Sequence, residues 1–535
     1  MASSRNSTPT VVVDRPGTVG ISRTQSDASN LTTRTSEESL KGLKKLISFP
    51  VMMGSLLVAV ALVSARTRLP DPDTWWHIAV GDLILKTHTW PSSDIYSFTA
   101  TGAPWTAYEW VGEVVMALGQ RSGLVGLSAL LMALVGVIAI LIYYYSYLRC
   151  GNSKAACVAT ATIVPIAGAI FTLRPQLIGY VFLLIALICL ERFRQGHRKE
   201  IWILPPLFLV WVNTHGTFAF GMAMVGLYWV SGLFTFRLGG LSAEAWSPKD
   251  RRTLSLVFLF SLIALLITPY GSSLAAYPLQ MALMQPFNIA NIQEWQSLTF
   301  GLGVGKYLLG LMLLFFFAHV LVPVRYKLHE MVMLLFGAYS ACVHIRFVLI
   351  FMMFLAPVIA VILTNWIPPY DPKKDKPALN LIIIALIALS LVKLLPDKKA
   401  LNKIVDDDYP VGAVAYLEQH PQPTGMFNEY GYGGYLIWRL GPSHKVFIDG
   451  RADLYEYAGV FQDYMKIANL DSQALRLFPK YNIQSCLIQK TSTLATLLAS
   501  SAEWRLIYSD KASDLFERVK PVPSGVPGRT ASKAF

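Results

Sequence analysis

The sequence has 535 residues, of which 54% are hydrophobic and only 15% are charged. This composition excludes a single soluble domain, since many apolar runs reach the roughly 20 residues that a membrane-spanning helix requires. The formal net charge is +13, but the basic residues cluster in short loops between apolar runs, so we expect no nucleic-acid partner. None of the five cysteines makes a CxxC pair, which argues against a disulfide framework or a zinc site.

The first 45 residues are rich in Ser, Thr and Arg and lack apolar periodicity. We predict that residues 1–45 form a disordered cytoplasmic tail rather than a cleavable signal peptide. The first apolar run, which begins at Leu46, is then an uncleaved anchor.

About eleven apolar runs follow within residues 46–396, which we predict to be a transmembrane domain of α-helices. The fifth run is short enough to be re-entrant. The runs are Leu46–Ala65, Gly123–Tyr147, Ala155–Leu173, Gln176–Leu190, Ile201–Val212, Phe218–Phe236, Leu254–Ile267, Leu308–Val322, Leu328–Val343, Phe347–Trp366 and Leu379–Leu395.

Basic residues fall in alternate loops between these runs, for example Arg149, Arg198, Arg251, Arg325 and Lys373. The intervening loops are nearly free of them, apart from the long first loop. An excess of Lys and Arg on one side predicts that this side is cytoplasmic. We therefore expect an integral membrane protein, most simply of a bacterial inner membrane, with a cytoplasmic N-terminus and an extracytoplasmic (periplasmic) C-terminal domain.

Two longer segments fall on the predicted outer side, namely the first loop, residues 66–122, and residues 402–519. The second segment has strand-like runs at Lys445–Ile448 and Ser485–Ile488, with helical stretches at Val411–Gln419 and Thr493–Ser500. This alternation predicts a small α/β domain. Residues 520–535 are rich in Pro, Gly and Ser and are predicted to be a flexible tail.

Unusual polar residues are brought to the outer membrane surface by this threading. They are Asp71 and Asp73 in DPDTWWH, Arg174 in LRPQ, Asn213 and His215 in WVNTHG, Glu294 in NIQEWQS, and Arg346 in HIRF. Charged groups at membrane depth are costly and are functional candidates by default. Each also has a structural interpretation: capping or packing for His215, turn chemistry around Asp71, snorkelling for Arg174, and an aromatic belt for the tryptophans.

As a set, these residues suit transfer from a lipid-phosphate-linked donor. Carboxylates act as general bases or hold a divalent cation. Arginines neutralise phosphate. The phosphate would be the leaving group, stabilised by arginine or metal as charge develops.

The order of these features resembles the GT-C superfamily of polyprenyl-phosphate-dependent glycosyltransferases, in particular the single-subunit oligosaccharyltransferases of bacteria and archaea. The first outer loop, DPDTWWHIAVGDLILKTHTWPSSDIYSFTATGAPWTAYEW, is similar in pattern to theirs. The resemblance implies a catalytic acid at Asp71 or Asp73, a metal and acceptor role for Glu294, and donor binding by Arg346. We add Arg174, His215 and Asn213 as candidates for donor-phosphate binding.

In the outer domain, FNEYGYGGYLIW followed by VFIDGR resembles the acceptor-recognition segment of those enzymes. The glycines and tyrosines there also suit tight packing, and Asp-Gly-Arg also suits a turn closed by an ion pair. The candidate acceptor-binding residues are Trp75, Trp76, His77, Asn428, Glu429, Tyr430, Tyr432, Asp449 and Arg451.

Two features depart from that family. The two tryptophans and aspartate of its acceptor motif are replaced here by residues 426–429, and its DxD pair in the second outer loop is absent from Leu173–Gln176. A Mg²⁺ or Mn²⁺ ion on Asp71, Asp73 and Glu294 and a metal-independent mechanism therefore both remain open, as does a sugar, lipid or protein acceptor. The competing functions are a transporter or flippase for a lipid-linked sugar and a non-enzymatic membrane scaffold.

Overall fold

The fold was determined as a computed structural model, which describes residues 42, 44–66, 68–69, 71–166, 171–301, 303–421 and 425–519. The predicted tail 520–535, and the predicted tail 1–45 except residues 42, 44 and 45, lie outside the described residues.

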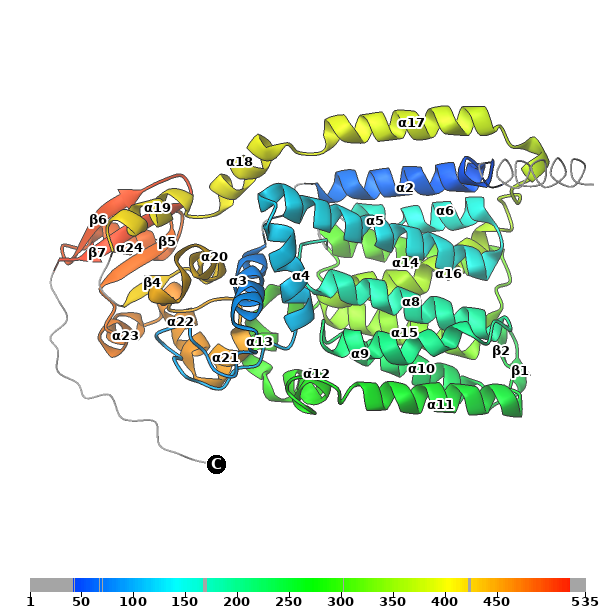
Figure 1. The fold of residues 1–535 in the computed structure, drawn as a ribbon, viewed down its shortest axis with the longest axis horizontal. Coiled ribbons are helices and arrows are strands. Elements are labelled where there is room, and N and C mark those ends of the chain that lie inside the picture. The colour runs from blue at the N-terminus through cyan, green and yellow to red at the C-terminus, as the bar shows by residue number, and fades with distance from the viewer. Residues whose placement is uncertain are drawn as a thin grey trace, which may run out of the picture.

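A bundle of apolar helices forms the larger part of the molecule (Figure 1). Most of its helices are apolar on all sides, which is typical of spans that face lipid or other helices rather than water. They are α2 (Phe49–Ala65), α5 (Gly123–Cys150), α6 (Ser153–Ala161), α8 (Gln176–Arg194), α9 (Leu204–Val212), α10 (Phe218–Ser231), α11 (Pro248–Ala264), α14 (Gly303–Leu321), α15 (Leu328–Val343), α16 (Val348–Leu363) and α17 (Pro377–Leu394).

Among the described residues, five helices are long and apolar enough to cross a membrane, and five apolar stretches are shorter. These ten coincide with ten of the predicted runs. The remaining run, Leu254–Ile267, lies largely in α11, whose first turns also carry Arg251 and Arg252. The bundle of an integral membrane protein is thus confirmed, whereas the number of spans stays a prediction.

A three-stranded sheet closes the end of the bundle farthest from the C-terminal domain (Figure 1). Strand β2 (Leu241–Ala243) pairs antiparallel with β1 (Phe236–Leu238) and parallel with β3 (Tyr326–Lys327). The predicted span Phe218–Phe236 was too long here. Helix α10 ends at Ser231, and Phe236 pairs with Ala243 in the sheet.

Two helices of the predicted first outer loop, α3 (Pro72–Thr87) and α4 (Trp110–Gln120), lie between the bundle and the C-terminal domain (Figure 1). Shorter elements join them there from the bundle helices: α12 (Ser273–Met284), α13 (Pro286–Asn291), η2 (Gln293–Trp295) and η3 (Ile345–Phe347).

The C-terminal domain is a small α/β unit, as predicted. Its four-stranded sheet has the order β4-β5-β7-β6, with β4 parallel to β5 and the other pairs antiparallel. The strands are β4 (Met426–Asn428), β5 (Ser485–Gln489), β6 (Trp504–Ser509) and β7 (Ser513–Arg518). The helices are α18 (Lys398–Asp408), α19 (Val411–Gln419), α20 (Tyr430–Leu440), α21 (Ala452–Tyr457), α22 (Val460–Ala468), α23 (Ala474–Lys480) and α24 (Thr493–Ser500).

The predicted strand Lys445–Ile448 is not part of this sheet. Val446 instead forms an isolated parallel bridge with Ser97 of the first outer loop, its N–H donating to the carbonyl of Tyr96 at 3.0 Å. The strand-like pattern was real, but its partner is the loop, so this segment fastens the domain to residues 96–98.

Candidate active site

The N-terminus of α3 carries the two predicted catalytic acids. Asp71 is the N-cap, and its Oδ1 accepts from the backbone N–H of Asp73 at 3.0 Å, while Pro72 occupies the first turn. An aspartate cap followed by proline is a strong helix start. The Asp71 side chain is therefore occupied as the cap of α3. Asp73 follows Pro72 in the first turn of the helix.

Arg174 joins three of the predicted residues. Its Nε lies 2.7 Å from Asp71 Oδ1, and its Nη1 lies 3.0 Å from Asp73 Oδ2 and 3.1 Å from Glu294 Oε2. The turn that presents it is held to α3 because the Thr74 hydroxyl donates to the carbonyl of Leu173 at 2.7 Å. Residues more than 200 positions apart in the sequence thus meet in one ion-pair network, as the threading predicted.

Arg346 extends the network at the start of α16. Its Nη1 lies 3.4 Å from Glu294 Oε1, and its guanidinium stacks on Trp295 with Cζ 4.1 Å from the ring centroid. The Nε atom is buried and has no hydrogen-bond partner among the residues that the structure describes. A stacked guanidinium with an unused donor is suited to an anionic ligand.

A second group of buried acids and histidines lies behind this network, and the sequence reasoning missed its acids. His215 Nε2 is 3.3 Å from Glu109 Oε1 and His77 Nε2 is 3.5 Å from Glu109 Oε2, while His77 Nδ1 is 3.4 Å from Glu113 Oε1. The available signal was a pair of glutamates four residues apart in the otherwise apolar segment YEWVGEVVMALG. That spacing places both on one helix face.

Burial determines the protonation of these groups. It raises the pKa of Asp73 to about 7, with Arg174 opposing and Asp71 and Glu294 adding to the rise. Burial likewise raises the pKa of Glu109 to about 8 and that of Glu113 well above its usual range. It lowers the pKa of His215 to about 3. Near neutral pH, protonated glutamates therefore face neutral histidines, and Asp73 lies at its titration point.

Glu294 behaves differently from the other carboxyls. Although burial opposes ionisation, Arg346 and Arg174 hold the pKa of Glu294 below its usual range. It is therefore the ionised carboxylate that links the two arginines and fixes their separation.

The predicted metal ligands do not fit a shared divalent cation in this arrangement. The side chains of Asp71, Asp73 and Glu294 all face the guanidinium of Arg174. Within the described ranges, no group of three or more His, Cys, Asp or Glu side chains has an arrangement that could hold a metal ion. Positive charge at this site is supplied by arginine.

Asn213, a predicted phosphate ligand, uses its side-chain amide for hydrogen bonds within the protein. Its Nδ2 donates to the carbonyls of Leu209 at 2.8 Å and Ile267 at 3.2 Å, and its Oδ1 accepts from Trp110 Nε1 at 2.8 Å. We therefore leave Asn213 out of the proposed site.

The tryptophans after Asp73 divide between packing and the site. Trp75 is fully buried and stacks on Trp438 of the C-terminal domain, with centroids 4.7 Å apart. Trp76 Nε1 donates to Asp73 Oδ1 at 3.2 Å, so it orients that carboxylate.

Most predicted acceptor residues of the C-terminal domain have partners within the protein. Asn428 is buried and bonds the backbone of Phe447 and Ile448, and the Tyr432 hydroxyl donates to the carbonyl of Ala512 at 2.9 Å. Asp449 and Arg451 form a fully buried ion pair. Their acceptor role stays a prediction.

Gly450 brings the domain to the site. Glu429 accepts from the Tyr464 hydroxyl at 2.7 Å within the domain, and burial, with Asp73 adding to the effect, raises the pKa of Tyr430 well above its usual range. A Cβ added at Gly450 would lie 1.8 Å from Asp73 Oδ1. Only glycine allows the VFIDGR segment to approach Asp73 this closely.

No family model and no curated protein matches this sequence. Among solved structures, the chain is similar to two crystal structures of ArnT from Cupriavidus metallidurans, one bound to undecaprenyl phosphate and one in the apo state. Each is 14% identical and covers 87% of this chain and 97% of the ArnT chain, with TM-scores of 0.47 and 0.48 respectively.

Proposed function

We propose that this protein is a membrane glycosyltransferase that moves a sugar from a polyprenyl-phosphate-linked donor to a sugar, lipid or protein acceptor. The observation that carries this proposal is Arg346, a stacked guanidinium with a free Nε, beside the Asp71–Asp73–Arg174–Glu294 network at the end of an apolar bundle. A bundle of apolar helices suits a lipid tail, and the arginines suit its phosphate. The resemblance of the outer-loop motifs to GT-C enzymes agrees with this assignment, on the predicted extracytoplasmic side.

Asp73 is the proposed general base. Its pKa of about 7 lies near the operating pH, where a base is most effective, and its side chain is 18% exposed. Asp71 is only 7% exposed and is engaged as the helix cap and as the partner of Arg174 Nε. Asp71 is therefore a positioning residue, which separates the two roles that the sequence left open.

The reaction follows from these positions. An acceptor oxygen or nitrogen attacks the anomeric carbon of the sugar, its proton passes to Asp73, and the bond between that carbon and the phosphate oxygen breaks. The electron pair stays on the phosphate, whose growing charge is balanced by Arg346 and Arg174. Glu294, which bonds both arginines, holds them at the required spacing.

Release of polyprenyl phosphate from a panel of polyprenyl-phosphate sugars, by the purified full-length protein in proteoliposomes, tests this proposal. We expect Asp73→Asn to lower the rate by about 100-fold or more while undecaprenyl-phosphate binding is retained. Arg346→Ala should instead weaken that binding. Asp82→Asn is the matched control, since Asp82 lies on the same helix and forms a solvent-exposed ion pair with Lys86.

Full activity of Asp73→Asn would contradict the assignment of the base. Movement of the lipid-linked sugar across the bilayer without any cleavage would favour a transporter. Unchanged lipid binding and turnover in Arg346→Ala combined with Glu294→Gln would favour a scaffold.

A further inference from the structure

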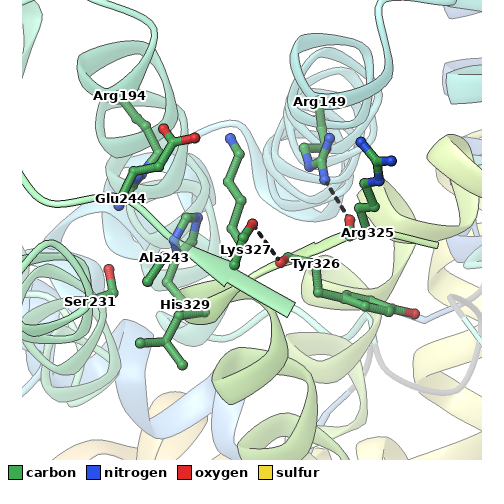
Figure 2. A pocket seen from close by; sticks show the side chains of 11 residues that line it. Arg149, Arg194, Ser231, Ala243, Glu244, Arg325, Tyr326, Lys327 and His329 are labelled. Carbon is green, nitrogen blue, oxygen red and sulfur yellow. Dashed lines mark hydrogen bonds between the residues drawn. The ribbon is translucent and has the colours of Figure 1, made fainter. Parts of the chain in front are cut away.

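A cavity of about 190 Å³ lies at the end of the bundle that carries the three-stranded sheet, opposite the candidate active site. One water occupies about 30 Å³ of liquid, so the cavity has room for a larger polar group. Figure 2 shows Arg149 and Arg325 on one side, Lys327 in the middle, and Arg194 with Glu244 on the other.

Two of the four cations that line the cavity are neutralised by the protein. Arg149 Nη2 lies 3.1 Å from Glu330 Oε2, and Lys327 Nζ lies 3.0 Å from Glu191 Oε1. These two ion pairs hold the ends of α5, α8 and α15 together. Arg149 and Lys327 therefore have a structural role that requires no ligand in the cavity.

The other two cations have no ion pair in the part of the chain that the structure describes. Arg194 stacks on Trp246, with Cζ 4.3 Å from the ring centroid, and its Nε is buried without a hydrogen-bond partner among those residues. Arg325 is exposed at the opposite wall. Two guanidinium groups that face one cavity from two sides repel each other, and an anion bound between them would offset that repulsion.

His329 gives an independent sign of a missing ligand. It lines the same cavity, is only 1% exposed, and neither ring nitrogen has a hydrogen-bond partner in the described ranges. A buried polar group without a partner costs free energy, and such groups are rare in native proteins. An acceptor bound in the cavity would satisfy it.

We propose that this cavity binds a phosphate group, carried either by an anionic lipid headgroup or by a soluble phosphate. Arg194 and Arg325 would bind it from two sides, as guanidinium groups bind phosphate. The site lies at helix ends, because Arg149 and Arg194 are in the last turns of α5 and α8 and Lys327 is the N-cap of α15. Glu244, the carboxylate in the lining, is exposed at the rim and forms no ion pair among the described residues.

Binding to the purified full-length protein in detergent tests the proposal, with inorganic phosphate and short-chain phosphatidic acid as separate probes and phosphatidylcholine as the neutral lipid. Every protein carries Arg346→Ala, so that the proposed donor site does not contribute and the two proposals fail independently. We expect saturable binding of a phosphate probe. Arg194→Gln with Arg325→Gln should weaken it by about tenfold or more.

The matched control is Arg251→Gln with Arg252→Gln, which removes the same charge from exposed positions of α11 outside the cavity. It should leave the affinity within about twofold. Binding of phosphatidic acid without competition from inorganic phosphate identifies a lipid headgroup, and equal binding of inorganic phosphate identifies a soluble ligand.

Absence of saturable binding by either probe would overturn the proposal, as would an equal loss in the control variant. Because Arg194 packs on Trp246, Arg325→Gln alone is measured as well. Arg325 is exposed and without an ion pair, so this variant should fold normally, and unchanged affinity there would equally contradict the proposal.

Discussion

Arg174 and Arg451 are two arginines surrounded by carboxylates at the junction between the bundle and the C-terminal domain. Arg451 lies 2.7 Å from both Asp94 and Asp449, is enclosed by Trp105, and has a side chain that is 0% exposed. Arg174 has three carboxylate partners and a side chain that is 23% exposed.

Access, rather than the number of partners, distinguishes the two arginines. The Arg451 cluster is fully buried and joins the first outer loop to VFIDGR, so it holds the domain in place. The Arg174 cluster includes Asp73, which retains partial exposure and a pKa near neutrality. A charge network open to a ligand is the one suited to chemistry.

The largest expected effect is on stability. Arg451→Met leaves Asp94 and Asp449 buried without their cation, which costs about 3–5 kcal/mol. Thermal unfolding in detergent should therefore show a large drop, while Arg174→Met, at a partly exposed site, should lower stability less and abolish transfer. Equal stability of the two variants would remove the distinction between the clusters.

The second expected effect is a loss of transfer rate when the contact between the C-terminal domain and Asp73 is disturbed. Gly450→Ala places a Cβ 1.8 Å from Asp73 Oδ1, and the carboxylate must move. Because a displacement of about 1 Å can cost about 100-fold in rate, transfer should fall strongly while the domain stays folded. Gly431→Ala is the control, since its nearest neighbour beyond the helix is Pro72 Cγ at 3.9 Å; a similar loss there would mean that α20 tolerates no added methyl.

The sequence predicted the bundle, the α/β domain and the convergence of Asp71, Asp73, Arg174, Glu294 and Arg346, because apolar runs and loop charges constrain which residues reach one end. It did not predict which of the two carboxylates caps the helix, since that depends on the geometry of the first turn of α3. The burial of Asp449 and Arg451 likewise depends on their tertiary contacts. The same Asp-Gly-Arg triplet would be a surface turn if residues 96–98 and Trp105 did not enclose it.

Glu109 was missed because its role depends on tertiary contacts with His77 and His215. Its pKa is about 8 in the folded protein and near 4.5 when unfolded, so the folded state retains a proton that the unfolded state loses. Ionisation of the unfolded state therefore destabilises the wild type progressively from about pH 4.5 to about pH 8, and the effect is constant above that. In Glu109→Gln this loss is absent.

The unfolding temperature of Glu109→Gln relative to wild type should therefore rise between about pH 5 and pH 8, by the equivalent of about 1 kcal/mol or more. Glu200→Gln is the control, because Glu200 is partly exposed and Arg192 lowers its pKa. A pH-independent difference for Glu109→Gln would show that Glu109 is ionised in the folded protein.

The smallest expected effect is that of metal removal. Asp71, Asp73 and Glu294 would have to release Arg174 before they could share a divalent cation, and Glu294 would also have to release Arg346. Because these charge-assisted contacts already satisfy the carboxylates, we expect EDTA to leave the transfer rate within about twofold of its starting value. A loss that added Mg²⁺ or Mn²⁺ restores would instead mean that Arg174 turns away when substrate binds. The Arg174 cluster would then differ from the Arg451 cluster in mobility as well as in its access to a ligand.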